Sequence, residues 1–211
     1  MAAKEIITIG RQFGSGGHEV GRRLAAELGF RLYDKELLKM MAQESNICEQ
    51  VLEDYDEKNT GSLLYSIMTD VYPSMNYAGN SLQRQIYQAQ YDTIRKIGEK
   101  GNCVIVGRGA DYILRDLPHV TSVFIHADVK YRIGRIVEFE KVSEQKAKDI
   151  ITKADKKRAS YYNFQTEKKW GSVSSYNLSL DTGDIGIDGC VDVIRCYLER
   201  KRNTDLERTG N

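Results

Sequence analysis

Five short apolar runs are separated by segments in which apolar residues recur at helical spacing. The runs cover residues 5–10, 30–34, 103–106, 121–127 and 176–182. Each run is too short for a buried helix, so each predicts a buried strand. Strands that alternate with helices favour a parallel sheet with both faces covered. We therefore expect an α/β protein of three layers, with a five-stranded parallel sheet flanked by helices.

Apolar residues at intervals of three or four positions predict amphipathic helices between these strands. The first helix follows Glu19 and ends at Gly29, a residue type that often caps helix C-termini. Ser81 is expected to cap a long helix that ends near residue 100. Residues 46–80 are less regular, and two short helical pieces and a turn-rich loop are expected there. Further helices are expected at 35–45, through 132–137, from 143 towards 162, and after a turn at 183–186, before a frayed polar tail from residue 201.

Glycines cluster directly after the first strand. Residues 10–21 read Gly-Arg-Gln-Phe-Gly-Ser-Gly-Gly-His-Glu-Val-Gly, which is the layout of a strand end, a loop and a helix N-terminus. Glycine lets the backbone adopt positive φ and brings N–H groups close to a ligand. The first turn of a helix adds unpaired donors and a partial positive charge. The loop is therefore a candidate cradle for phosphate.

The composition restricts the class of protein and of partner. The chain has 211 residues, 41% hydrophobic and 29% charged, which is typical of a single globular domain over 1–211. Lys and Arg number 31 against 30 Asp and Glu, so no overall charge favours nucleic acid or a membrane surface as partner. The four cysteines form no CxxC pair, and neither a signal peptide nor a membrane-spanning apolar run is evident. These features indicate a cytoplasmic protein.

Two known phosphate-binding loops compete for the glycine-rich stretch. The dinucleotide fingerprint G-x-G-x-x-G begins at Gly14, but Glu19 stands at its third glycine. Asp34, at the end of the second strand, would suit a ribose in that arrangement. The P-loop pattern is G-x-x-x-x-G-K-[ST], and the stretch from residue 10 to residue 16 is one residue longer than its two glycines allow. Residues 17–18 are Gly-His, where the pattern needs Lys followed by Ser or Thr. The loop alone leaves both interpretations open.

Motifs further along the chain favour the P-loop. Gly107-Arg108-Gly109, two arginines three residues apart after Phe-Ile-His-Ala, Asp-Lys-Lys-Arg at 155–158, and Leu-Asp-Thr at 180–182 follow one another in order. They resemble the arginine turn, arginine-bearing helix, lid and last strand of cytidylate kinases. The loop at 10–17, with Tyr-Asp-Lys-Glu-Leu at 33–37, is similar to the divergent cytidylate kinase-like family. The resemblance implies a P-loop NTPase fold, an acceptor-binding helical insertion at 46–80 and a lid at 139–170.

The resemblance also implies a reaction. A nucleoside monophosphate kinase transfers the γ-phosphoryl group of ATP, with Mg²⁺, to CMP, dCMP or a similar acceptor. Such transfer needs reactants held in line and positive charge or N–H donors on the phosphoryl oxygens. Ser15 and Glu19 are the candidate Mg²⁺ ligands, Glu19 acting indirectly. The residues expected to surround the ATP phosphates are Phe13, Gly14, Ser15, Gly16, Gly17, His18 and Glu19.

The lysine that normally follows the γ-phosphoryl group is absent from this loop, so another cation must supply its charge. Arg11 and Arg22 are the nearest candidates, although Arg11 is also consistent with a solvated surface arginine. His18 is interpreted either as part of the cradle or as a neutral residue of the first helical turn. A cationic imidazole there would oppose the helix dipole.

Arginines near the other strand ends receive roles in the same scheme. Arg108 lies between two glycines and can bind a phosphate bidentately, or it pairs with Asp111 or Asp116. Arg132 and Arg135 are neighbours on one helix face, and the resemblance makes them contacts to ATP. It makes Arg158 a contact from a lid that closes over the reactants. Without the resemblance, each of these three would be read as a solvated charge.

Acidic and hydroxyl side chains complete the candidate site. Asp34 is expected to orient the acceptor or receive its proton, and it also suits a helix N-cap. Asp181 and Thr182 shape the base or phosphate pocket, or only a turn. Tyr161, Tyr162 and Trp170 could stack on a base or simply pack.

Nucleotides are the expected partners, and the sequence leaves the oligomeric state undetermined. Two other functions stay open. The first is a catalytically weak nucleotide-binding or regulatory protein with a degenerate P-loop. The second is a dinucleotide-dependent oxidoreductase, in which Asp34 would contact ribose hydroxyls.

Overall fold

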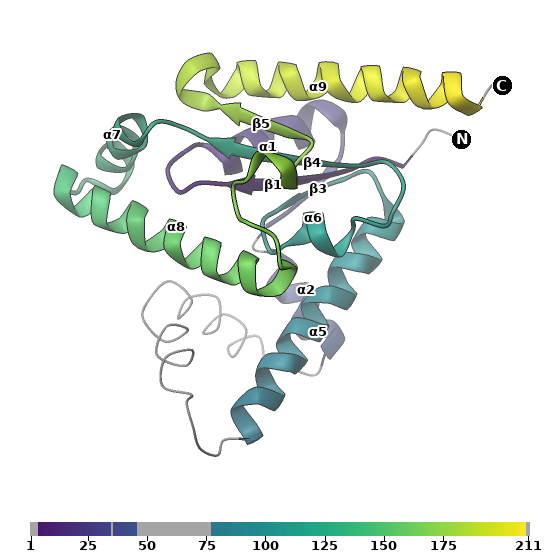
Figure 1. Cartoon of the computed structure of the whole chain (residues 1–211), viewed down its shortest axis with the longest axis horizontal. Helices are drawn as coiled ribbons and strands as arrows, with labels where there is room; N and C mark the ends of the chain where they lie inside the picture. The colour runs from purple at the N-terminus through teal and green to yellow at the C-terminus, as the bar shows by residue number, and fades with distance from the viewer. Residues whose placement is uncertain (1–3, 35, 46–76, 210–211) are drawn as a thin grey trace.

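A single parallel sheet lies at the centre of the protein (Figure 1). The computed structural model describes residues 4–34, 36–45 and 77–209. The strands pair in the order β2-β3-β1-β4-β5, every pair being parallel. Each predicted apolar run contains a strand, so the predicted α/β fold class is confirmed. The strands are β1 (Ile6–Arg11), β2 (Arg31–Tyr33), β3 (Cys103–Val106), β4 (Val120–His126) and β5 (Leu178–Asp181).

Helices cover both faces of this sheet. Successive side chains of β1 point to opposite faces of the sheet. Ile6 packs on one face with the cluster formed by α2, α5 and α6, and Ile7 and Ile9 pack on the other face with α1 and α9. Figure 1 shows α9 on one side of the sheet and α5 and α6 on the other. The helices are α1 (Gly17–Leu28), α2 (Glu36–Ser45), α5 (Tyr77–Lys100), α6 (Ala110–Ile113), α7 (Val129–Glu140), α8 (Glu144–Thr166) and α9 (Thr182–Thr209).

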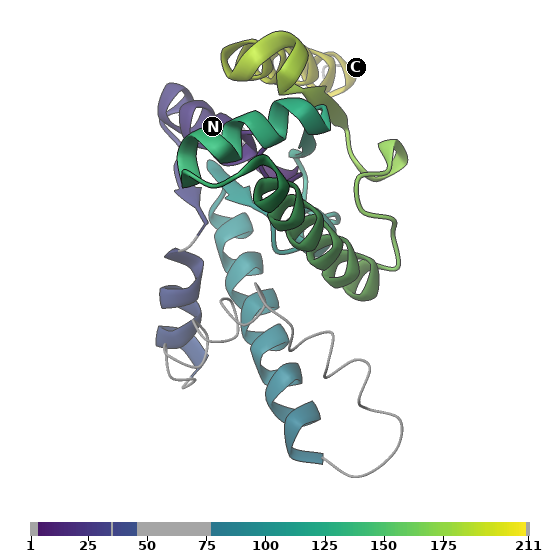
Figure 2. The same cartoon turned by 90° about the vertical axis from the view of Figure 1, so that its left-hand side faces the viewer.

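Helices α7 and α8 pack on each other beside the carboxyl end of β4 (Figures 1 and 2). Their shared apolar cluster is small, with Ile136, Ala147 and Ile151 buried. Phe13 of the glycine loop packs against the same cluster. Helix α8 is thereby held against the loop. Within the described residues, no helix is long and apolar enough to cross a membrane.

Three predicted boundaries are wrong. Ser81 does not begin a helix, because α5 already starts at Tyr77. Gly79 and Asn80 are weak helix formers, but each costs about 1 kcal/mol or less, which does not prevent a helix of 24 residues from including them. The turn at 183–186 is reduced to a break at Gly186 (φ 72°) inside α9. The tail is helical to Thr209, and its first residue, Lys201, donates to the Val120 carbonyl at 2.7 Å. Residues 46–76 of the predicted insertion lie outside the described residues.

Candidate active site

The glycine loop connects β1 to α1 with two residues in the left-handed region. Gly14 has φ 79°, and Gly16, the N-cap of α1, has φ 81°. A Cβ at Gly14 would lie 3.2 Å from the carbonyl oxygen of Arg132, and a Cβ at Gly16 would lie 3.2 Å from Ile187 Cδ1. Both positions therefore need glycine for conformation and for space. The N-terminus of α1 is left to face a ligand with its main-chain donors.

Two buried hydroxyl groups fix this loop to the end of the sheet. Ser15 is fully buried, and its Oγ, which has one hydrogen to donate, lies 2.9 Å from the carbonyl oxygen of Gln12 and 3.2 Å from that of Ile125. Thr182 is also buried, and its Oγ1 donates to the Ser15 carbonyl at 2.5 Å and lies 3.2 Å from the His126 carbonyl oxygen. Both side chains hold the loop from beneath. Neither lines either of the two cavities described below.

Arg11 occupies the space that a side chain at residue 17 would need. A Cβ at Gly17 would lie 2.5 Å from Arg11 Cβ and 3.1 Å from its Cγ. At the other end of the side chain, a Cβ at Gly107 would lie 2.0 Å from Arg11 Nη1. Two glycines thus leave room for one arginine that runs from the end of β1 to the turn after β3. The lysine of a standard P-loop has no room here.

The loop forms one wall of a cavity of about 870 Å³. The residues that line it include seven lysines or arginines but only two carboxylates, those of Glu19 and Asp34. This excess of positive charge suits a polyanionic ligand. The cations are Arg11, Arg108, Arg135, Lys146, Lys153, Lys157 and Arg158.

One face of α8 forms the opposite wall. The residues that line the cavity recur at intervals of one, three and four, which places them on a single side of the helix. Three lysines and Arg158 share this face, so a helix outside the glycine loop presents cations towards it. The lining residues are Lys146, Ile150, Lys153, Ala154, Lys157, Arg158 and Tyr161.

Arg158 and Arg132 both tie this region to the glycine loop, but only Arg158 lines the cavity. Arg158 Nη1 donates to the Arg11 carbonyl at 3.3 Å, its guanidinium lies 5.4 Å from the Phe13 ring centroid, and burial lowers its pKa. Arg132 is buried; its Nη1 donates to Asp155 Oδ2 at 2.6 Å, and Asp155 Oδ1 accepts from the Phe13 N–H at 2.7 Å. Arg132 and Asp155 therefore clamp α7, α8 and the loop together.

At the β2 and β3 ends, His18, Asp34 and Arg108 line the same cavity. His18 Nε2 lies 3.2 Å from Asp34 Oδ2, so the helix-start histidine faces the strand-end acid. Arg108 is the middle of three successive residues with positive φ, at 58°. This conformation costs a residue with a Cβ about 1–2 kcal/mol. The two acids that were considered as partners of Arg108 each contact another residue. Asp111 accepts from Tyr162 at 2.6 Å, and Asp116 lies 3.7 Å from Arg115 Nε.

Two side chains named in the predictions are held by ion pairs on α1. Glu19 accepts from Arg22 at 2.7 and 2.8 Å and from Arg23 at 2.8 Å. These hydrogen bonds lower the pKa of the Glu19 carboxyl to about 2. Arg22, considered as a substitute for the lysine, does not line the cavity.

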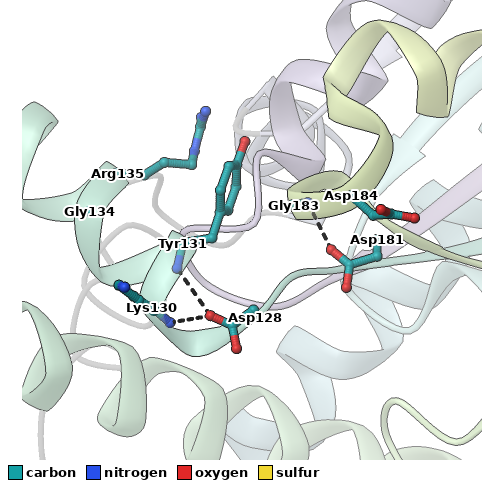
Figure 3. Close-up of a pocket in the computed structure, with 8 residues that line it drawn as sticks. All are labelled: Asp128, Lys130, Tyr131, Gly134, Arg135, Asp181, Gly183 and Asp184. Atoms are coloured by element: carbon teal, nitrogen blue, oxygen red, sulfur yellow. Dashed lines mark hydrogen bonds between the residues drawn. The ribbon is translucent and has the colours of Figure 1, made fainter.

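A second, more open cavity has a volume of about 720 Å³, and Figure 3 shows the residues that line it. It runs between α7, which contributes Tyr131 and Arg135, and the β5 end with Asp181 and Asp184. Arg135 lines both cavities and lies 5.9 Å from the Tyr131 ring centroid. Asp181 Oδ1 accepts from the Gly183 N–H at 2.7 Å. We call this second cavity the aspartate groove and the first the cationic cavity.

Known proteins resemble this chain in sequence and in fold. A model of the cytidylate kinase-like family matches residues 6–184. The chain belongs to that family. A cytidylate kinase from Methanococcus vannielii is 26% identical over 196 residues, which cover 90% of this chain and 97% of the relative.

Solved structures agree with the fold. An uncharacterized protein from Eubacterium ventriosum is 34% identical, with a TM-score of 0.70 over 93% of this chain and 99% of its own. A shikimate kinase from Bacteroides thetaiotaomicron, 16% identical, has a TM-score of 0.53 over 93% and 99% of the two chains. The fold is thus a P-loop kinase fold, and family membership supports a nucleotide kinase-like phosphotransferase.

Within the family fold, most of the predicted site residues meet at the cationic cavity. Arg135 joins it to the aspartate groove, where Asp181 lies. Ser15, Arg132 and Thr182 line neither cavity and are bound to the loop or its neighbours instead. The predicted residues of the cationic cavity are Arg11, Phe13, Gly14, Gly16, Gly17, His18, Glu19, Asp34, Arg108, Arg135 and Arg158.

Magnesium fits this site only in part. The Ser15 hydroxyl is buried between two carbonyls, so it cannot serve as the usual metal-bound hydroxyl. Glu19 lines the cavity and keeps a carboxylate that a bound water could reach. Mg²⁺ keeps several waters and often binds through one carboxylate and the substrate phosphates. Among the described residues, no group of three or more His, Cys, Asp or Glu is placed to hold a metal.

Sequence reasoning did not single out Gln90, Lys146, Tyr131 or Asp184. Tyr131 had a signal, because it lies four residues before Arg135 and therefore on the same helix face. Lys146 had none from Arg158, because a spacing of twelve residues places the two about 120° apart around the helix. Gln90 had none, since it lies in the middle of an ordinary amphipathic helix and reaches the cavity only in the folded chain.

Proposed function

We propose that the protein is a nucleoside monophosphate kinase that transfers the γ-phosphoryl group of ATP to CMP, dCMP or a similar acceptor. One observation carries the proposal: the glycine loop and seven cationic side chains line a single cavity. A polyphosphate needs such a surface, and a dinucleotide site would not need this many cations.

ATP is proposed to bind across both cavities. Its phosphates would lie on the main-chain donors of residues 16–19 at the start of α1, and its base in the aspartate groove near Tyr131. Arg135 lines both cavities, so it is the side chain suited to contact ATP between base and phosphates. Asp181 offers a carboxylate at the groove, and Thr182 supports the loop from beneath.

The acceptor is proposed to bind at the β2 and β3 ends. Arg108 would hold its phosphate, and Asp34, beside His18, would orient the acceptor or receive a proton. An acceptor phosphate oxygen attacks the γ-phosphorus as the bond to the β,γ-bridging oxygen breaks, and ADP leaves. The cations hold the reactants in line and neutralise the charge that moves towards the bridging oxygen.

Two sources replace the charge of the missing lysine in this scheme. Arg11 passes beneath the start of α1, where a lysine would begin, and ends beside Gly107. Arg158 and the lysines of α8 add charge from the opposite wall, within the segment proposed as a lid. Arg132 is proposed to hold α8 against the loop through Asp155, and not to contact ATP. Mg²⁺ would neutralise the β- and γ-phosphates when it binds with ATP, with Glu19 contacting its waters.

The proposal is tested by incubating the protein with ATP, Mg²⁺ and each nucleoside monophosphate in turn. It predicts ADP and a nucleoside diphosphate in equal amounts, with CMP or dCMP among the best acceptors. Absence of both products with every acceptor contradicts it.

A nucleotide-binding or regulatory role is the second candidate. It is favoured by one observation, the lack of both the loop lysine and a free loop hydroxyl, since Ser15 is buried. In that case ATP would raise the melting temperature of the protein, but no ADP would appear. A cytoplasmic location remains a prediction.

A further inference from the structure

A buried glutamine connects three walls of the cationic cavity. Gln90, on α5, is only 5% exposed and lines the cavity. Its Nε2 donates to the carbonyl of Arg108 at 3.1 Å and to the hydroxyl of Tyr161 at 2.5 Å. These partners are 18 and 71 residues away in the sequence. One amide group therefore joins α5, the helix that carries it, to the turn after β3 and to the α8 face.

The Arg108 contact is made to a strained main chain. Residues 107–109 all have positive φ, and Arg108 is the one member of the three that carries a side chain. A hydrogen bond to its carbonyl stabilises the peptide orientation that comes with this conformation. The Arg108 guanidinium can enter the cavity reproducibly only if its main chain is held.

The Tyr161 contact joins the same amide to the lid helix. Tyr161 follows Arg158 and Lys157 on the α8 face that lines the cavity. A buried amide with both hydrogens bonded is costly to disturb, because each lost hydrogen bond leaves a polar group unsatisfied. A displacement of α8 therefore acts on the group that holds Arg108.

We propose that Gln90 is a positioning residue that holds the main chain of Arg108 for acceptor binding and links it to α8 through Tyr161. The assignment rests on the proposed function for its kinetic consequence. Its structural part, the stabilised turn at 107–109, does not depend on catalysis.

The experiment compares Gln90→Met with Gln88→Met. Methionine keeps the length of glutamine and removes the donors. Gln88 is a matched control on the same helix, because it is exposed and its Nε2 donates to Asp92 Oδ1 at 2.9 Å, away from the cavity. We expect Gln90→Met to raise the KM for CMP about tenfold while the KM for ATP stays within twofold, and Gln88→Met to change neither. Equal changes in both KM values for Gln90→Met, or none, overturn the proposal.

A second measurement does not need activity. Amide hydrogen exchange of the free Gln90→Met protein should be faster in a peptide that covers residues 107–113 and unchanged in one that covers β1. Tyr161→Phe removes only the link to α8, so it should leave the 107–113 peptide nearly as protected as in the wild type. Wild-type exchange rates at 107–113 in Gln90→Met overturn the proposal even if the protein proves to be an active kinase. If the wild type transfers no phosphoryl group, the exchange result still decides the role of Gln90 in the turn.

Discussion

The two cavities share Arg135 but differ in charge and in how they are built. The cationic cavity is lined by seven lysines and arginines and by two carboxylates. The glycine loop forms one of its walls with main-chain atoms, and the buried Ser15 and Thr182 hold that loop in place. The aspartate groove has two cations against three carboxylates, and side chains of α7 and the β5 end form it. Phosphate is bound by charge and main-chain N–H groups, and a base by shape and a few polar groups. We therefore propose that the cationic cavity supplies the affinity for phosphate and that the aspartate groove selects the base.

The largest effect is expected from a side chain in the loop itself. Gly16→Val would place a β-branched residue at φ 81°, 3.2 Å from Ile187. The N-terminus of α1 could then not keep its form, and we expect ATP affinity to fall at least a hundredfold in calorimetric titration. Gly29→Val is the matched control, since Gly29 also has positive φ (66°) but has open space around a Cβ. It should lower the melting temperature and leave ATP affinity unchanged; a similar loss in both variants contradicts the cradle.

The next largest effect is expected at the acceptor end. Arg108→Ala removes a cavity guanidinium from an edge position, so the fold should persist while kcat/KM falls about a hundredfold, as when one donor to developing charge is removed. Arg115→Ala is the control, because Arg115 lies over the Tyr112 ring outside the cavity. Circular dichroism tests whether the fold persists, and initial rates give kcat/KM for both variants. An unchanged turnover number in Arg108→Ala would refute the role.

A smaller effect is expected from the α8 lysines. The double variant Lys153→Ala/Lys157→Ala removes two charges from the cavity, and we expect about a tenfold loss of ATP affinity with a weaker dependence on salt, because fewer ionic contacts remain to be screened. Lys148→Ala removes a lysine from an exposed position of the same helix outside the cavity lining. If Lys148→Ala weakens ATP as much as the double variant, the effect comes from overall charge and not from the α8 face.

The smallest effect is expected in the aspartate groove. It distinguishes binding of the base there from binding of the phosphates in the cationic cavity. Tyr131→Ala removes a ring from the groove, and about a fivefold loss of ATP affinity is expected, consistent with one aromatic contact. Inorganic tripolyphosphate has no base, so its affinity should not change. Equal losses for ATP and tripolyphosphate would show that the two cavities do not divide base from phosphate.

The fold was largely predictable because its strands are continuous apolar runs. Cys103–Val106 is buried at every position, so its sequence carries the full signal of a central parallel strand. The helix ends were less predictable. Lys201 lies in the helical tail and donates to the carbonyl of Val120, 81 residues away, and no local pattern contains that contact.

The site was predictable where function lies in the main chain or at a strand end. Gly14 and Gly16 were found because positive φ demands glycine, and Arg108 because it follows a buried strand. Ser15 and Arg132 line neither of the two cavities described above, although their residue types suit metal and phosphate. Their hydrogen bonds to distant carbonyls and to Asp155 exist only in the folded chain.

The central claim is that the loop binds phosphoryl groups without the P-loop lysine. Calorimetric titration of the wild-type protein with ATP and with adenosine, in the presence of Mg²⁺, tests it most directly. The account predicts a dissociation constant for ATP at least a hundredfold below that for adenosine, because the cationic cavity adds its contacts only to the phosphates. Equal dissociation constants for ATP and adenosine would contradict it.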